Sequence, residues 1–324
     1  MDAFESRIDL SELYQTVADI RTEVGKIIIG QQSMIDLLLT ALFADGHVLI
    51  EGVPGVAKTL TAKILAKTIS VDFNRIQFTP DLMPSDVLGT SVFNPKTSDF
   101  EFKPGPIFSN IILIDEINRA PAKTQSALFE VMEERQVTNA GHTYHMTAPF
   151  LVLATQNPIE QEGTYRLPEA QLDRFLFKIV VQYPSLDQET EILKGHHQRR
   201  QIADAMDTIQ AILSKEQLAA LREKVRQVLI EDKVLTYIAQ IVHETRNSKF
   251  LYLGASPRAS VALLNASKAL AALRGRDFVT PEDVQELAAP VLRHRLILTP
   301  EKEMEGTTPD AIIDQIIKKI EVPR

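Results

Sequence analysis

The stretch LIEGVPGVAKTL, residues 49–60, indicates the fold of this 324-residue chain. It begins as a short apolar run, passes through two glycines and leads into TLTAKILAKTI, which has helical periodicity. A strand, a glycine-rich turn and a helix in this order are typical of a phosphate-binding loop, with the pattern Gly-x-x-x-x-Gly-Lys-Ser/Thr. Gly52, Lys58 and Thr59 match that pattern, whereas Ala57 stands in place of its second glycine.

This loop predicts a nucleotide site, because backbone N–H groups and the start of the following helix attract phosphate. Gly52 and Gly55 would supply unusual backbone angles, and Ala57 would be tolerated if its φ is negative. Lys58 would neutralise the β- and γ-phosphates, and Thr59 would offer its hydroxyl to Mg²⁺. The alternative is an ordinary glycine turn before a helix. The residues expected to contact the nucleotide are Gly52, Val53, Pro54, Gly55, Val56, Ala57, Lys58, Thr59 and Leu60.

Apolar runs on either side of this loop predict a sheet. Short runs with the character of buried strands follow HVLIEG, at residues 75–78, 110–115, 150–155 and 174–182. Helical patterns between them indicate a parallel sheet with crossover helices, the α/β class. Residues 1–45 and everything after about residue 187 have helical periodicity. The chain is therefore predicted to have an α/β core at 1–186 and an all-helical domain at 187–324.

Two acidic residues end one of the predicted strands. In IILIDE, Asp115 and Glu116 come directly after four apolar residues. Ligands of parallel sheets bind at the carboxyl ends of the strands, so both side chains should lie beside the phosphate loop. Asp115 suits coordination of Mg²⁺, direct or through water, and Glu116 suits a base that polarises the attacking water. Alone, an Asp-Glu pair is more often a solvated strand end; together with the loop it indicates an ATP-hydrolysing site.

Three later residues are weaker candidates. Asn157 follows the run at 150–155 and could reach between the γ-phosphate and the attacking water, although Asn-Pro is also a common turn. Arg174 stands at a helix-to-strand junction, where a surface salt bridge is the ordinary interpretation. Arg258 lies in the first turn of a predicted helix, where a cation is slightly unfavourable, which suggests that an anion or a function keeps it there.

The ordered set of motifs resembles the AAA+ ATPases, and most closely the MoxR family. GVPGVAKT is similar to the Walker A motif of that family, in which alanine commonly occupies the position of Ala57. LIDEINRAP is similar to its Walker B region and ATQNP to its sensor 1. LPEAQLDRF resembles its arginine-finger region and GASPRAS its sensor 2.

The resemblance implies a P-loop core with a five-stranded parallel sheet, a helical lid, and a ring that is usually a hexamer. ATP and Mg²⁺ would lie in the cleft between neighbours. Arg174 would reach in trans to the neighbour's γ-phosphate, with Arg166 and Arg119 as rival fingers, and Arg258 would act in cis. In IIIGQ, residues 27–31, Gly30 and Gln31 would pack on the adenine; simple core packing of this segment is equally open.

Two insertions refine the resemblance. Residues 82–108 are rich in proline, glycine and aspartate, and alternation within FEFKPGPIF suggests a short hairpin; the resemblance identifies them as a helix-2 insert. Residues 135–147 have a strand–turn–strand pattern, similar to the hairpin that precedes sensor 1. Such elements often face the pore of a ring or the bound client.

Composition and charge limit the remaining possibilities. The chain lacks cysteine, carries a net charge of −8 and has neither a signal peptide pattern nor a bilayer-spanning run, so we expect a cytoplasmic protein without membrane insertion. Its acidic surface argues against nucleic acid as a partner. The leading hypothesis is a ring-forming ATPase that remodels a protein client or promotes its maturation or cofactor insertion. By resemblance, a von Willebrand factor A domain protein is its usual partner. A magnesium-chelatase-like motor subunit, a DNA-associated motor and a simple phosphotransferase are the alternatives.

Overall fold

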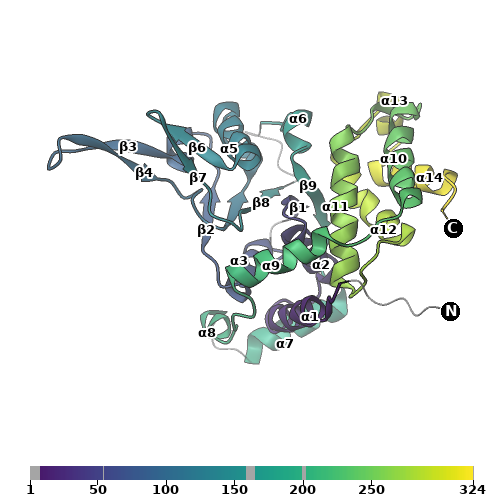
Figure 1. Cartoon of the computed structure of the whole chain (residues 1–324), viewed down its shortest axis with the longest axis horizontal. Helices are drawn as coiled ribbons and strands as arrows, with labels where there is room; N and C mark the ends of the chain where they lie inside the picture. The colour runs from purple at the N-terminus through teal and green to yellow at the C-terminus, as the bar shows by residue number, and fades with distance from the viewer. Residues whose placement is uncertain (1–7, 54, 158–164, 199–201, 324) are drawn as a thin grey trace.

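A five-stranded parallel sheet forms the centre of the molecule (Figure 1). The computed structural model describes residues 8–53, 55–157, 165–198 and 202–323. The strand order is β2-β5-β8-β1-β9, with every neighbouring pair parallel, which confirms the predicted fold class. The strands are β1 His47–Gly52, β2 Phe73–Gln77, β5 Ile111–Asp115, β8 Leu151–Gln156 and β9 Phe175–Val181.

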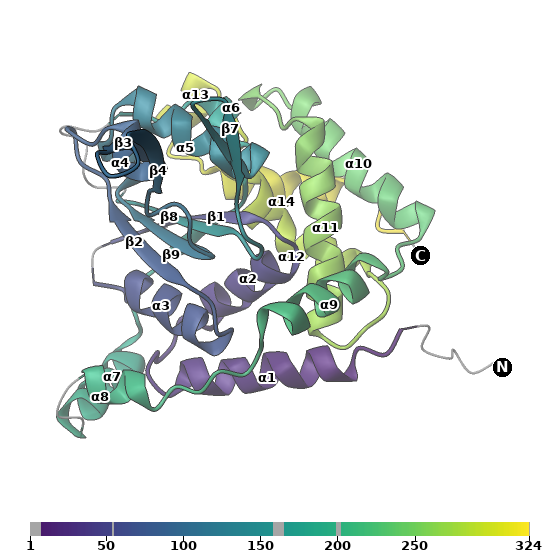
Figure 2. The ribbon, with the colours of Figure 1, turned by 60° about the vertical axis from the view of Figure 1, so that its left-hand side comes forward.

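Both faces of the sheet are buried, which explains the continuous apolar runs. Successive residues of a strand point to opposite faces, so Ile111 and Leu113 join one core cluster while Ile112 and Ile114 join the other. One face is covered by α2 and α3 and the other by α5 (Figure 2). The helices of the first half are α1 Ser11–Gly25, α2 Gln32–Phe43, α3 Lys58–Thr68, α4 Pro84–Leu88, α5 Ala122–Glu134 and α6 Glu169–Leu172, and a short 3-10 helix spans Ile117–Arg119.

Two antiparallel hairpins project from the sheet on the side away from the C-terminal helices (Figure 1). The first pairs β3 Gly89–Asn94 with β4 Asp99–Pro104, and the second pairs β6 Gln136–Asn139 with β7 His142–His145. Phe102 stacks on Tyr144 with ring centroids 4.3 Å apart, so the hairpins touch each other. The second hairpin follows the strand–turn–strand pattern in the sequence. The first differs from the expected one, because it begins at Gly89 and FEF forms only its second strand.

The C-terminal half is mostly helical, as predicted, but it also contains a small sheet. Leu251–Leu253 (β10) pairs antiparallel with Ile297–Leu298 (β11), a two-stranded sheet that the prediction of an all-helical domain missed. Strands of three and two residues are too short to show the alternation of apolar and polar residues by which a strand is predicted. The division at residues 186 and 187 stays a prediction, because a single core cluster includes side chains from both halves. The helices are α7 Leu186–Gln198, α8 Ile202–Asp207, α9 Lys215–Arg226, α10 Asp232–Asn247, α11 Pro257–Leu273, α12 Pro281–Leu292, α13 Pro300–Met304 and α14 Pro309–Lys319.

Within the described ranges, no helix is both long enough and apolar enough to cross a bilayer. The expected cytoplasmic location stays a prediction.

His47, the first residue of β1, is a buried histidine that joins the sheet to α5. One ring nitrogen, Nε2, lies 3.1 Å from the carbonyl oxygen of Met132, and the other, Nδ1, accepts a hydrogen bond of 3.0 Å from the N–H of Val152. These contacts require a neutral ring with its proton on Nε2. Burial lowers the pKa of His47 to about 4. A protonated ring would lose the bond from Val152 and carry an unsolvated charge.

We therefore expect the fold to weaken in mild acid. The unfolded state takes up a proton at the ordinary pKa of 6.5 and the folded state only near 4, so stability is complete above 6.5 and falls toward 4. The His47 contribution to the free energy of unfolding falls by about 1.4 kcal/mol for each pH unit, or by about 3 kcal/mol between pH 6.5 and pH 4. Urea unfolding at several pH values measures it. His47→Gln should make the profile less steep and leave the slope due to the other buried histidine, His294, whose pKa burial also lowers. The same change at exposed His142 should leave the profile unchanged. Equal profiles for all three proteins would contradict the assignment.

Candidate functional site

Lys58 lies where the phosphate loop meets the following helix. β1 ends at Gly52 and α3 begins at Lys58, so the loop joins the carboxyl end of a central strand to a helix N-terminus. The Lys58 Nζ donates a hydrogen bond of 2.6 Å to the carbonyl oxygen of Gly52. Burial lowers the pKa of Lys58, while the nearby carboxylates of Asp115, Glu116 and Glu51 act to raise it. The ammonium therefore interacts electrostatically with Asp115, the predicted magnesium ligand, and with Glu116, the predicted base. Thr59 and Leu60 follow, half-buried, in the first turn of α3.

The backbone angles of the loop correct two expectations. Ala57 has φ of 60°, in the left-handed region, whereas the sequence interpretation required a negative value. An alanine in the left-handed region costs about 1–2 kcal/mol. Gly52 has no positive φ; it is needed because a Cβ would lie 2.9 Å from the carbonyl oxygen of Val181. Gly55 has the expected positive φ, 87°, and Pro54 lies outside the described residues.

Asp115, at the end of β5, is buried and firmly held. Its Oδ2 lies 2.6 Å from Nε of Arg75, and its Oδ1 accepts a hydrogen bond of 3.0 Å from the hydroxyl of Thr155. That hydroxyl in turn accepts a hydrogen bond of 3.1 Å from the N–H of Glu116. Because both oxygens of Asp115 are already engaged, the arrangement favours contact with Mg²⁺ through a water over direct coordination.

Glu116 follows in a strained conformation with φ of 57°. Its Oε2 accepts a hydrogen bond of 2.9 Å from Nε2 of Gln77 and pairs at 2.9 Å with Nε of Arg119. A non-glycine residue in the left-handed region costs about 1–3 kcal/mol and is found mostly at functional sites. The turn directs the carboxylate to the carboxyl edge of the sheet, the same edge as the phosphate loop. Asn157 reaches this edge as well, half-buried directly after β8, the strand between β5 and β1.

The segment expected to pack on adenine lies against the chain that follows β9. Gly30 has φ of 72°, and a Cβ there would lie 2.7 Å from Cδ of Gln188. Gln31 donates from Nε2 to the carbonyl oxygen of Gln182 at 3.1 Å. Ile28 is buried in the core, so this segment does pack as part of the core. Contact of Gly30 and Gln31 with a nucleotide stays a prediction.

Arg174 and Arg258 lie together at the opposite edge of the sheet. Helix α5 starts after Glu116 and runs back along the sheet, and its last turn lies at the amino end of β1, as the His47–Met132 contact shows. In that last turn, Glu133 pairs at 2.6 Å with Arg174, which directly precedes β9, and at 2.8 Å with Arg258 from α11. The chain therefore separates these two arginines from its own phosphate loop.

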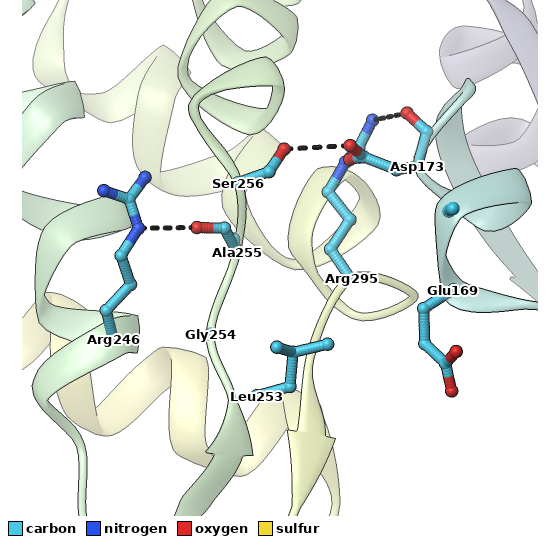
Figure 3. A pocket seen from close by; sticks show the side chains of 9 residues that line it. Glu169, Asp173, Arg246, Leu253, Gly254, Ala255, Ser256 and Arg295 are labelled. Carbon is cyan, nitrogen blue, oxygen red and sulfur yellow. Dashed lines mark hydrogen bonds and ion pairs between the residues drawn. The ribbon is translucent and has the colours of Figure 1, made fainter.

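Sequence reasoning missed the residues that support Arg174. The Asp173 carboxylate accepts a hydrogen bond of 2.8 Å from the hydroxyl of Ser256 and pairs at 2.7 Å with Arg295, whose side chain is 3% exposed (Figure 3). Residues of the C-terminal half thus hold Asp173, which is next to Arg174 and lines a cavity of about 510 Å³. The one available signal was the run of cations at 293–295 in an otherwise apolar stretch. The rival arginines occupy the other edge: Arg119 pairs with Glu116, and Arg166 follows Tyr165, whose N–H donates to Asn118 at 2.6 Å.

Known proteins match this arrangement over nearly the whole chain. Residues 47–177 match the ATPase family associated with various cellular activities (AAA), and residues 243–316 match the AAA lid domain. Chaperone MoxR1 of Mycobacterium tuberculosis is 44% identical over 93% of this chain and 81% of its own length. The chain belongs to the MoxR family of AAA+ ATPases.

Two further similar proteins match this chain over nearly its whole length. The uncharacterized protein YeaC of Bacillus subtilis is 47% identical over 96% of each chain. The crystal structure of a candidate ATPase from Cytophaga hutchinsonii superposes with a TM-score of 0.89, at 44% identity and 97% coverage of both chains.

Membership of this family indicates ATP hydrolysis, and the residues present are suited to bind ATP with Mg²⁺. Lys58 and Thr59 open an 11-residue helix, and buried Asp115 supplies oxygen on the same edge of the sheet. A helix N-terminus, an ammonium and a carboxylate are the partners that a magnesium-bound triphosphate requires.

Proposed function

We propose that this MoxR-family ATPase works as a ring and is inactive as a single subunit, because each ATP site is completed by two neighbouring subunits. One observation carries the proposal. The acidic and phosphate-loop residues lie at the carboxyl ends of the strands, here called the first edge, and the Arg174–Arg258 pair lies at their amino ends, here called the second edge. A closed ring places the second edge of one subunit against the first edge of the next. Six subunits, the usual number for such rings, is the expected size.

The residues at the first edge would bind ATP and activate water. Lys58 would neutralise the β- and γ-phosphates, and Thr59 and Asp115 would hold Mg²⁺, which draws charge from the phosphate oxygens when bound. Glu116 would accept the proton of the attacking water, and Asn157 would orient that water. Gln77 and Arg119 hold the Glu116 carboxylate at this edge, so the base is positioned by its own subunit.

The residues at the second edge would act on the neighbour's ATP. Arg174 would stabilise the charge that develops on the transferred phosphoryl group. Because Glu133 holds Arg258 beside Arg174, we propose that Arg258 also acts in trans, in place of the cis role expected from the sequence. The pairing of both arginines with one carboxylate supports a shared task.

We further propose chaperone-like remodelling of a protein client, including its maturation or cofactor insertion, with a von Willebrand factor A domain protein as the partner. Support comes from the chaperone name of the Mycobacterium tuberculosis relative and from the two projecting hairpins. On the first hairpin, Phe93 and Phe100 are 50% and 67% exposed. Exposed aromatic side chains suit contact with apolar segments of a polypeptide.

The ATPase rate per subunit should rise steeply with protein concentration, and sizing in ATP should show the assembled ring over the same range. The physical reason is that an isolated subunit lacks the second edge of a neighbour. Lys58→Ala should abolish the rate at every concentration. A rate per subunit that stays flat while the protein remains monomeric would contradict the proposal. Stimulation by DNA at physiological salt, with none by a polypeptide client, would instead favour the DNA-associated motor.

A further inference from the structure

Glu133 is one carboxylate shared by two guanidinium groups from different parts of the chain. Its Oε2 lies 2.6 Å from Arg174, at the start of β9, and its Oε1 lies 2.8 Å from Arg258, in the first turn of α11. Two cations face one anion, so this cluster retains a net positive charge. A group that carries more negative charge than a carboxylate would satisfy the pair better.

Arg174 offers no exposed pair of free N–H groups to a phosphate in this arrangement, because its unpaired Nε is buried. An arginine binds phosphate through its parallel N–H groups. Here the NH2 nitrogen pairs with Glu133, and the NH1 nitrogen donates to the carbonyl oxygen of Phe129. The side chain is only 27% exposed. To reach a phosphate on another subunit, Arg174 must first leave Glu133.

The backbone on both sides of this cluster is fixed, so the exchange concerns side chains alone. Asp173, next to Arg174, is bound by Arg295 and by the hydroxyl of Ser256 (Figure 3). The same Ser256 oxygen accepts a hydrogen bond of 3.2 Å from the N–H of Arg258 and so caps α11. Ser256 therefore links the Asp173 side chain, next to Arg174, to the first turn of α11, which carries Arg258.

There is open space beside the cluster for such an exchange. A cavity of about 420 Å³ is lined by Glu133 and Arg174 together with Glu130, Glu134, Gln171 and Ser126. Side chains that line an open cavity can change rotamer without repacking the core.

We infer that Glu133 is a positioning residue that holds Arg174 and Arg258 in an unassembled subunit and is replaced by the γ-phosphate of a neighbour's ATP. This inference rests on the proposed function, because it requires the two arginines to act in trans. Glu133 then competes with the neighbour's phosphate for the same N–H groups. Its carboxylate raises the protein concentration that ATP-dependent assembly requires and keeps single subunits inactive.

The test compares Glu133→Gln with Glu134→Gln, an exposed carboxylate at the next position that lines the same cavity. Both changes are made in the Glu116→Gln background, so that ATP persists, and assembly is followed by sedimentation. Glu133→Gln should lower the protein concentration at half-assembly about threefold, since an exposed ion pair changes an equilibrium constant by up to about a factor of five. Glu134→Gln should match its background. Equal midpoints for the two variants, or weaker assembly of Glu133→Gln, would overturn the inference.

A double change separates competition from a general effect on the interface. With Arg174→Ala and Arg258→Ala also present, Glu133→Gln and Glu134→Gln should assemble at the same concentration, because no guanidinium remains to be released. A persistent difference would show that Glu133 acts through another contact and would overturn the inference. Failure of the proposed function looks different: the parent protein would then not assemble with ATP, and Arg174→Ala would keep full ATPase activity.

Discussion

Glu116→Gln subunits should bind ATP normally and hydrolyse it at least about a hundred times more slowly than wild type. The amide has nearly the same shape as the carboxylate and can still accept a hydrogen bond from Gln77, 2.9 Å away in the wild type. It cannot accept a proton from water. Nucleotide binding by titration with a fluorescent ATP analogue, together with single-turnover hydrolysis, separates the two effects.

Glu303→Gln is a suitable control for this change, because Glu303 is an exposed carboxylate of α13, in the C-terminal half of the chain. It should keep the wild-type rate. If Glu116→Gln retains more than about a tenth of that rate, Glu116 is not the base. Trace Glu116→Gln should also lower the activity of wild-type rings by more than dilution explains, because its ATP persists at a shared interface.

Arg174→Ala should have the largest effect of any change at the second edge of the sheet. Removal of an arginine finger typically lowers the rate by about 10³-fold or more, and ATP binding should remain because Lys58 and the phosphate loop are untouched. Steady-state ATPase assays and ATP titration measure the two quantities. A full rate for Arg174→Ala would show that the finger is another residue, and Arg119 and Arg166 would then be tested in the same way.

Mixtures of inactive variants decide whether the arginines act in trans. Arg174→Ala has an intact phosphate loop and Lys58→Ala has intact arginines, so a mixture should recover activity although each alone is inactive. Arg174→Ala mixed with Arg258→Ala should recover none, because every interface then lacks one arginine. If Arg258 acts on its own subunit's ATP, that second mixture recovers, since the Arg258→Ala subunit lends Arg174 to a neighbour that keeps its own Arg258.

The sequence alone predicted the elements whose signals are local. The strand at 111–115 is an almost entirely apolar run because helices cover both faces of its sheet. Such a run can be recognised from the sequence alone. The phosphate loop and the two acids at and after the end of β5 could also be recognised, because their chemistry requires fixed residue types at fixed spacing. Both the sheet and the family followed from these segments.

The roles that depend on distant residues needed the tertiary structure. Ala57 could be assigned a negative φ only while the loop was considered residue by residue; the closed loop places it in the left-handed region. Asp115 is held by side chains from β2 and β8, so its engagement cannot be inferred from its own neighbours in sequence.

The partnership of Arg174 with Arg258 was also decided by the tertiary structure alone. They are 84 positions apart, and Glu133, which joins them, lies 41 positions before Arg174. Local patterns report which faces of an element are buried, but not which elements meet. The sequence therefore determined the fold and the phosphate-binding edge. Packing of the C-terminal helices against the start of β9 determined where the second set of charged groups lies.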